Sequence, residues 1–267
     1  MPVYNSAIFI EAAIISVINQ NYPNLEFIII DGGSTDGTIQ IIEKYSQQLA
    51  YFITEKDQGQ SEAINKGFLK ATGDVLAWLN ADEEYLPGVL LKVGNEFRRN
   101  PKIDLVFGYR FHCDQFGDPL YLRRYPPIHP LNYMLYAARV LPTDATFWSK
   151  RAHEKTGMLN QKEYAHLAMD NDWLLRLSAN IKNWKRLRLP LAKFKEHTQR
   201  KTLCQPGRAY KLGLRLTRDF AVKHGINKWQ FIAGWLLWGT ISRFYEPKWW
   251  RLPSIITVLQ RIKKVAR

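Results

Sequence analysis

The sequence has little cysteine and no long apolar run, and both absences narrow what the protein can be. Its 267 residues include two cysteines, Cys113 and Cys204, which are too few for a disulfide framework and lack metal-ligand spacing. No apolar run reaches the roughly 18 residues of a membrane-spanning helix; 229-WQFIAGWLLWG-239 comes nearest. The opening residues have neither the basic start nor the apolar core of a secretory signal. We therefore expect a protein of the cytosol or of the cytoplasmic membrane face.

Three common active-site motifs are absent as well. The glycine-rich segment 31-DGGSTDGT-38 matches neither the G-x-G-x-x-G fingerprint of dinucleotide-binding proteins nor the lysine-bearing phosphate loop. No G-x-S-x-G sequence marks a hydrolase nucleophile, and the six histidines have no evident nucleophilic companion. The sequence therefore gives poor support to dinucleotide binding, to phosphate-loop chemistry and to triad hydrolysis.

What the first 95 residues do contain is an alternation of helix and strand patterns. Apolar positions recur at helical spacing in three segments, and short β-branched or apolar runs lie between them. The expected helices cover 7–21, 36–48 and 60–71, and the expected strands cover 25–30, 51–55 and 74–79. This order predicts an α/β fold with a mostly parallel, Rossmann-like central sheet flanked by helices. Such sheets bind ligands at the carboxyl ends of their strands.

Acidic residues follow three of these expected strands. Asp31, Asp57 and Asp82 each come directly after a strand and have glycine nearby, so all three can line one crevice. The alternative is that each acid only caps a solvent-facing turn. In 79-LNADEEYLPG-88 three acids stand together and repel one another unless water or a cation compensates them. Hard cations such as Mg²⁺ or Mn²⁺ bind one or two carboxylates together with substrate phosphates, so a shared ion and nucleotide diphosphate would explain the cluster.

Five segments in order resemble glycosyltransferase family 2. They are 2-PVYN-5, 26-EFIIIDGGSTDGT-38, 57-DQGQSEAINKG-67, 73-GDVLAWLNADEEYLPG-88 and 169-MDNDWLLRL-177. The resemblance covers roughly residues 2–200 and implies a GT-A fold. It implies a glycosyltransferase domain at 1–200, with a nucleotide-binding half at 1–95 and an acceptor-binding half at 96–200. It also implies inverting transfer from a nucleotide-diphosphate sugar to an acceptor hydroxyl of a glycan or lipid-linked saccharide, assisted by Mn²⁺ or Mg²⁺.

The resemblance also assigns roles to particular residues. Asp31 matches the acid that reads the nucleotide base, and 80-NAD-82 matches the family's D-x-D with asparagine first. Asp170 matches the catalytic base, with Asp172 as the alternative, while Arg176 is expected to pair with an acid on its own helix. The implied donor-binding residues are Pro2, Tyr4, Asp31, Gly59, Asn80 and Ala81, and the implied metal ligands are Asp82, Glu84 and His197. Glu83 is an alternative to Glu84, and an ordinary buried histidine is the alternative for His197.

Two features depart from the family pattern. Relatives have a complete apolar strand before the Pro-Val-Tyr-Asn segment, and Met1 stands where its last residue would be, so we expect the first strand to be missing. Met169 stands where many relatives have glutamate before the base. A catalytically inactive member that only binds nucleotide sugar is therefore the second hypothesis.

The last quarter of the chain carries most of its positive charge. Residues 201–267 contain seven lysines and seven arginines against two acids, a net +12 of the formal +14 of the whole chain. Five tryptophans lie in the same region, and 253–267 has the pattern of an amphipathic basic helix. We expect a helical basic extension at 201–267 that attaches peripherally to the anionic cytoplasmic membrane face. The alternative is a helical extension that packs on the domain, with its aromatic side chains in the core. Nucleic-acid binding is disfavoured, because no recognition motif accompanies the charge.

Overall fold

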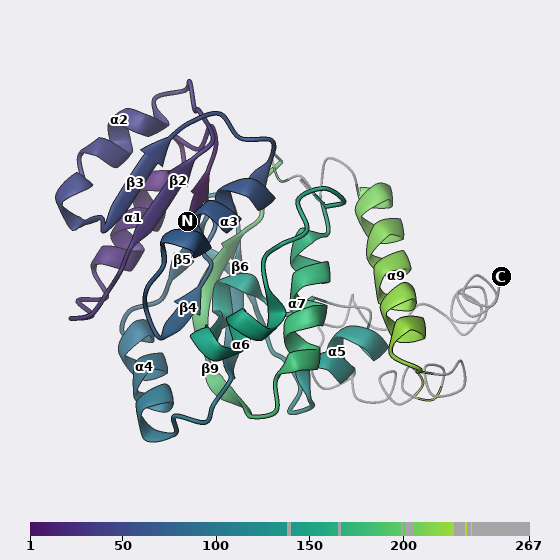
Figure 1. Ribbon diagram of the computed structural model, residues 1–267. Helices are drawn as coiled ribbons and strands as arrows, with labels where there is room; N and C mark the ends of the chain where they lie inside the picture. Colours follow the sequence, from purple (N-terminus) through teal and green to yellow (C-terminus); the bar gives the residue numbers. More distant parts are fainter. Residues whose placement is uncertain are drawn as a thin grey trace.

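A computed structural model describes residues 1–137, 140–164, 167–198, 200 and 206–226, together with the single positions 233 and 236. The expected amphipathic helix at 253–267 and all five tryptophans of the basic extension lie outside these residues. Figure 1 shows the arrangement of the described part, with the N-terminal strands and helices on one side and α9 on the other.

The N-terminal residues form a three-stranded parallel sheet, as the alternating pattern predicts. Its strand order is β1-β2-β3, and the connections between strands are helical. The strands are β1 (Pro2–Val3), β2 (Ile28–Asp31) and β3 (Tyr51–Thr54), and the helices are α1 (Ile10–Ile18), α2 (Thr38–Glu43), the short 3₁₀ turn η1 (Ser46–Gln48) and α3 (Gln60–Lys70).

The second sheet is mixed, which differs from the single, mostly parallel sheet expected from the sequence. Its order is β4-β8-β6-β9-β5 with β7 beside β6, and only the β6–β9 pair is parallel. The hairpin from β6 to β7 turns at Gly117, and so short a connection can only join antiparallel strands. The strands are β4 (Val75–Ala77), β5 (Glu83–Tyr85), β6 (Leu105–Cys113), β7 (Pro119–Arg123), β8 (Thr146–Ser149) and β9 (Trp184–Lys195).

Helices from the second half cover this mixed sheet. They are α4 (Val89–Arg99), α5 (Pro130–Ala137), α6 (Lys150–Thr156), α7 (Met169–Asn180) and α9 (Pro206–Lys223), and the 3₁₀ turn η2 (Thr143–Ala145) precedes β8. Trp148 and Trp173 are fully buried between the sheet and α7 and lie 4.7 Å apart, centroid to centroid.

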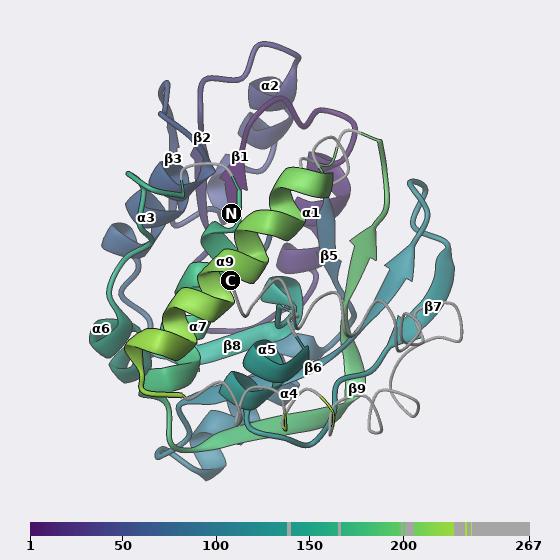
Figure 2. The same cartoon turned by 90° about the vertical axis from the view of Figure 1, so that its right-hand side faces the viewer.

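Helix α9, the described beginning of the basic extension, packs against α5 and α7 (Figures 1 and 2). Leu216 and Ala221 on its inner face belong to the same apolar core as Trp173. This part of the extension is therefore joined to the acceptor-side core through apolar side chains. No described helix has the length and apolar character needed to cross a membrane.

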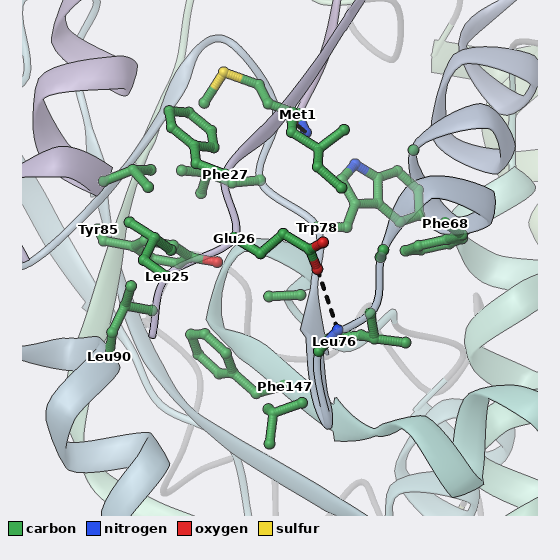
Figure 3. A pocket seen from close by; sticks show the side chains of 18 of the residues that line it. Met1, Leu25, Glu26, Phe27, Phe68, Leu76, Trp78, Tyr85, Leu90 and Phe147 are labelled. Atoms are coloured by element: carbon green, nitrogen blue, oxygen red, sulfur yellow. Dashed lines mark hydrogen bonds between the residues drawn. The ribbon is translucent and has the colours of Figure 1, made fainter. Parts of the chain in front are cut away.

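A cavity of about 200 Å³ lies between the edges of the two sheets. Met1 and Pro2 reach it from β1, and Val75 to Ala77 reach it from β4. Figure 3 shows apolar side chains around it, and Glu26 at its edge accepts a hydrogen bond of 3.1 Å from the backbone N–H of Gly73. Pro2 and Val3 themselves form the short strand β1, which pairs with β2 and not with β4.

One glycine beside this cavity gives a stability prediction. Gly67 lies inside α3, and a Cβ atom there would sit 3.7 Å from Cγ1 of Ile30, an ordinary contact. Because alanine favours a helix interior over glycine, Gly67→Ala is expected to raise the free energy of unfolding by about 0.5–1 kcal/mol.

The matched control is Gly108→Ala in β6. A Cβ atom at Gly108 would lie 2.5 Å from Cγ of Leu191 and 2.9 Å from the carbonyl oxygen of Leu189. We expect this overpacking to lower the free energy of unfolding by about 1–3 kcal/mol. Urea denaturation of the wild type and both variants measures the two effects, and a destabilised Gly67→Ala protein would contradict the packing described here.

Candidate active site

A cavity of about 960 Å³ opens at the carboxyl ends of the N-terminal strands. Segments far apart in the sequence form its walls: the turn after β1, the loops after β2 and β3, the turn after β4, the start of α7 and the segment after β9. This volume lies within the range of pockets that enclose a small-molecule ligand.

Hydrogen bonds between two loops build the first wall. The backbone N–H of Asn5 donates to Oγ of Ser34 at 2.8 Å, and that of Ser6 donates to Oγ1 of Thr38 at 2.8 Å. In return, Oδ1 of Asn5 accepts from the backbone N–H of Thr35 at 2.9 Å. The turn that holds Tyr4 is therefore fixed against the loop between β2 and α2.

Asp31 is fully buried behind this wall, and its carboxylate holds the loop after β2 in place. Its Oδ2 atom accepts hydrogen bonds from the backbone N–H groups of Gly33 and Ser34 at 3.0 and 2.9 Å, and from Oγ1 of Thr54 at 2.7 Å. The side chain does not line the cavity. In this structure Asp31 shapes the loop, and the adjacent Gly32 and Gly33 form the surface.

The loop after β3 adds Asp57 and Gly59 to the wall. A Cβ atom at Gly32 would lie 2.5 Å from Oδ2 of Asp57, so a larger residue there would push the Asp57 carboxylate aside. Oδ1 of Asp57 accepts from the backbone N–H of Gly59 at 2.9 Å, and Gly59 itself has a φ of 140°, which favours glycine. Two of the three acids expected in one crevice, Asp57 and Asp82, are thus in it.

The turn after β4 places Asn80, Ala81 and Asp82 in the same cavity. Oδ1 of Asn80 accepts from Nε2 of Gln60 and from Nε1 of Trp78, both at 2.8 Å. These two donors fix the orientation of the Asn80 amide. Gln60 comes from α3, and Trp78 directly follows β4.

Asp82 is held by two basic side chains from the segment after β9. Its Oδ2 atom lies 2.9 Å from Nε2 of His197 and 3.1 Å from Nη1 of Arg200. Burial opposes ionisation, but the hydrogen bond from His197 and the charge of Arg200 outweigh it and keep the pKa of Asp82 below its ordinary value. Asp82 is therefore an anion in this cavity at neutral pH.

The neighbouring acid, Glu83, points into the interior. Its Oε2 atom accepts from the backbone N–H of Asn80 at 3.0 Å, and only 1% of the residue is exposed. Burial and the charges of Asp144 and Asp82 raise the pKa of Glu83 to about 8. The buried carboxyl therefore holds a proton near neutral pH, which limits repulsion within the acidic turn.

Glu84 lies on the opposite face of β5 from Glu83, because successive side chains of a strand alternate. It forms an ion pair with Lys195 and lies 4.0 Å from Lys193, both on the paired strand β9. The structure therefore does not bring Glu84 to the cavity with Asp82.

Asp170 reaches the cavity from the first turn of α7. Its Oδ1 atom accepts from the backbone N–H of Asn171 at 2.9 Å, and burial raises its pKa. Asp172 instead pairs with Arg176, whose Nη2 and Nε atoms lie 2.8 and 3.0 Å from its Oδ2, as expected for an arginine on the same helix. Of the two candidates for the base, only Asp170 lines the cavity.

The structure thus brings together most of the residues singled out from the sequence. Those that line the cavity are Pro2, Tyr4, Gly59, Asn80, Ala81, Asp82, Asp170 and His197, whereas Asp31 and Glu84 do not. The sequence analysis missed Arg200. Its signal was a second basic residue three positions after His197, beyond the end of a strand.

The donor atoms fit a divalent ion that is shared with a phosphate ligand. Within the described ranges, no three His, Cys, Asp or Glu side chains are grouped so as to hold a metal without help. Asp82 and His197 supply one carboxylate and one imidazole at the same point. An ion whose coordination is completed by phosphates and water needs only one or two protein ligands.

Comparisons with known proteins agree with this fold. The family model described as "Glycosyl transferase family 2" matches residues 1–183. An uncharacterized glycosyltransferase of Haemophilus influenzae is 36% identical over 125 residues, which cover 46% of this chain and 50% of that protein. The chain spans half or less of the length of the curated relatives that it matches.

Two solved structures show the same fold at low sequence identity. Residues 1–349 of S. aureus TarS, in complex with UDP-GlcNAc, match at 16% identity with a TM-score of 0.64, covering 91% of this chain and 71% of that one. The mannosyltransferase PcManGT from Pyrobaculum calidifontis, in complex with GDP-Man and Mn²⁺, matches at 16% identity with a TM-score of 0.61, covering 100% and 79%.

The fold of this chain is therefore the GT-A fold. The family match covers more than half of the chain, so the chain belongs to glycosyl transferase family 2.

Proposed function

We propose that this chain transfers a sugar from a nucleotide-diphosphate sugar to an acceptor hydroxyl, with inversion at the anomeric carbon and with help from Mn²⁺ or Mg²⁺. The observation that carries the proposal is the meeting of Asp82 and Asp170 in one cavity of about 960 Å³. The similar folds of proteins solved with UDP-GlcNAc, and with GDP-Man and Mn²⁺, support a nucleotide-sugar donor.

In this proposal Asp170 is the general base. Its carboxylate takes the proton of the acceptor hydroxyl while the acceptor oxygen attacks the anomeric carbon, and the bond to the diphosphate breaks on the opposite face. A single displacement of this kind inverts the configuration. Burial supports the role, because it raises the pKa of Asp170 and makes the carboxylate a stronger base.

Asp82 and His197 would hold the divalent ion. When bound, that ion stabilises the negative charge that develops on the departing diphosphate. The loop behind Gly32 and Gly33 approaches the nucleotide through its backbone, and Asp57 closes the wall beside it. Asp31 supports that loop from within.

A donor screen tests the function. Purified protein is incubated with Mn²⁺ or Mg²⁺ and a panel of UDP- and GDP-sugars, and free nucleotide diphosphate is measured in the presence and absence of glycan and lipid-linked acceptors. The proposal expects metal-dependent release from one donor. Binding of a donor without release under any of these conditions would favour an inactive, nucleotide-sugar-binding member of the family.

A second proposal concerns the membrane. Four basic residues recur at helical spacing along α9, namely Arg208, Lys211, Arg215 and Arg218, and the apolar face of that helix is turned to the core. A basic stripe on a docked helix favours contact with an anionic bilayer. Peripheral attachment at the cytoplasmic membrane face would suit a lipid-linked acceptor.

Charge reversal on this stripe should weaken membrane binding. Arg215 is 80% exposed at its side chain, and Lys211 is exposed as well, so Lys211→Glu/Arg215→Glu is expected to leave the fold intact. Each basic residue near an anionic surface contributes about 1 kcal/mol, so the double variant should bind vesicles containing phosphatidylserine at least about tenfold more weakly. Flotation with and without phosphatidylserine measures this, and unchanged flotation would rule out α9 as the contact.

A further inference from the structure

Arg200 occupies a position in the cavity that the roles assigned so far do not explain. Its Nη1 atom lies 3.1 Å from Oδ2 of Asp82 and donates to the carbonyl oxygen of Lys195 at 2.7 Å. Its guanidinium carbon lies 3.6 Å from the ring centroid of Phe194, and its side chain is only 13% exposed. Lys195 and Phe194 of β9 hold the guanidinium beside the acidic turn, where its Nη2 atom also lies 3.6 Å from Oε1 of Glu83.

Arg200 and a divalent ion need the same carboxylate. Both would bind the cavity side of Asp82, and Oδ2 already receives Arg200 and His197 together. Two cations at one partly buried carboxylate repel each other strongly, because the local dielectric is low. An ion that enters this site must therefore displace Arg200 from Asp82.

A displaced Arg200 remains among the residues that line the cavity. The proposed donor brings a diphosphate to this place, and a guanidinium binds phosphate oxygens with its planar set of N–H donors. The turn redirects Nη1, the atom that pairs with Asp82 and also donates to Lys195, so both contacts change together.

We propose that Arg200 exchanges partners when the donor binds, pairing with Asp82 in the ligand-free protein and with the donor's diphosphate once a divalent ion holds Asp82. This inference rests on the proposed nucleotide-sugar function and assigns Arg200 a positioning role in it. The exchange makes metal binding and nucleotide binding cooperative. The ion alone binds weakly because it must displace Arg200 from Asp82, and the nucleotide alone binds weakly because Arg200 is already paired with Asp82. The coupling is the same in both directions.

Binding titrations test the exchange without any turnover. Mn²⁺ is titrated alone, followed by the electron paramagnetic resonance signal of the free ion, and UDP and GDP are titrated by calorimetry with and without saturating Mn²⁺. The variants are Arg200→Gln, which removes the competing charge, and Arg200→Lys, which keeps it. Arg99→Gln, at an exposed arginine on α4, controls for the loss of one positive charge.

The two ligands should respond to Arg200→Gln in opposite directions. A hydrogen bond to a charged group is strong enough that we expect Mn²⁺ alone to bind about tenfold more tightly, and UDP or GDP in saturating Mn²⁺ to bind about tenfold more weakly. Arg200→Lys keeps the positive charge, so both affinities should stay closer to the wild-type values than in Arg200→Gln. Arg99→Gln should change neither affinity. A purely structural role for Arg200 would weaken both ligands together.

The outcomes separate this inference from the function on which it rests. If the wild type binds neither UDP nor GDP with Mn²⁺, the proposed function fails and the inference fails with it. If the wild type binds nucleotide and Mn²⁺ but Arg200→Gln leaves Mn²⁺ affinity unchanged or lower, the inference alone is overturned.

Discussion

Asp170→Asn is expected to lower kcat by about 10²- to 10⁴-fold, the usual contribution of a positioned general base. Asparagine keeps the shape of the side chain and can still accept a hydrogen bond from the Asn171 backbone, but it cannot take a proton. The donor should therefore still bind with near wild-type affinity. Initial rates at saturating donor, with affinity measured separately by calorimetry, distinguish the two effects.

The pH profile gives a second check on the same residue. A general base works when it is deprotonated, so activity is lost as the pH falls through its pKa. Because burial raises the pKa of Asp170, the acidic limb of the wild-type profile should lie above the pH at which an exposed aspartate titrates. The residual activity of Asp170→Asn should lack this limb. Asp118→Asn, on the exposed turn between β6 and β7, should leave rate and profile unchanged, and loss of the limb there would contradict the assignment.

Asp82→Asn is expected to lower kcat/KM by about 100- to 1000-fold. Stabilisation of the leaving diphosphate by a metal is worth several kcal/mol, and each 1.36 kcal/mol is a factor of ten in rate. Asparagine lacks the negative charge that holds the ion, so the Mn²⁺ concentration needed for half-maximal rate should also rise. Steady-state rates over a Mn²⁺ series measure both quantities, and thermal unfolding checks the fold.

Glu84→Gln is the matched control for Asp82→Asn. Glu84 belongs to the same acidic turn in the sequence, yet its side chain pairs with Lys195 away from the cavity. We expect Glu84→Gln to stay within a few-fold of the wild-type rate. An equal loss in both variants would mean that the two acids act as one site, contrary to the geometry described above.

The acidic turn shows what could be predicted from the sequence and what could not. The pattern placed Asp82, Glu83 and Glu84 together at a strand end, and Asp82 is in the cavity. The sequence did not reveal that Glu83 and Glu84 lie on a further strand, β5, where alternation sends one inward and the other towards β9. Three residues are too few to show a period of two, so only the fold could separate these acids.

The longest strand was also hidden in the sequence. β9 contains Pro190 and five basic residues among its twelve positions, a composition typical of a loop or surface segment. It forms because it lies between β6 and β5, and Pro190 coincides with a register shift against Tyr109. Since β9 leads directly to His197 and Arg200, missing the strand also meant missing the arginine.

The direction of the Asp31 side chain could not be predicted from the sequence. Asp31 was predicted to follow a strand, and the structure makes it the last residue of β2, after a run of isoleucines. Whether such a carboxylate faces a ligand or the loop behind it depends on nearby N–H and hydroxyl groups. Here Gly33, Ser34 and Thr54 engage it, and Thr54 comes from the next strand, which a local pattern cannot reveal.

The stereochemistry of transfer tests the central claim most directly. With a donor whose sugar is α-linked to the diphosphate, proton NMR of the fresh product reports the configuration of the new bond through the anomeric coupling constant. A single displacement assisted by Asp170 predicts a β-linked product that forms only in the presence of the divalent ion. A product that keeps the α configuration would contradict the account, because a single displacement from the face opposite the diphosphate inverts the anomeric carbon.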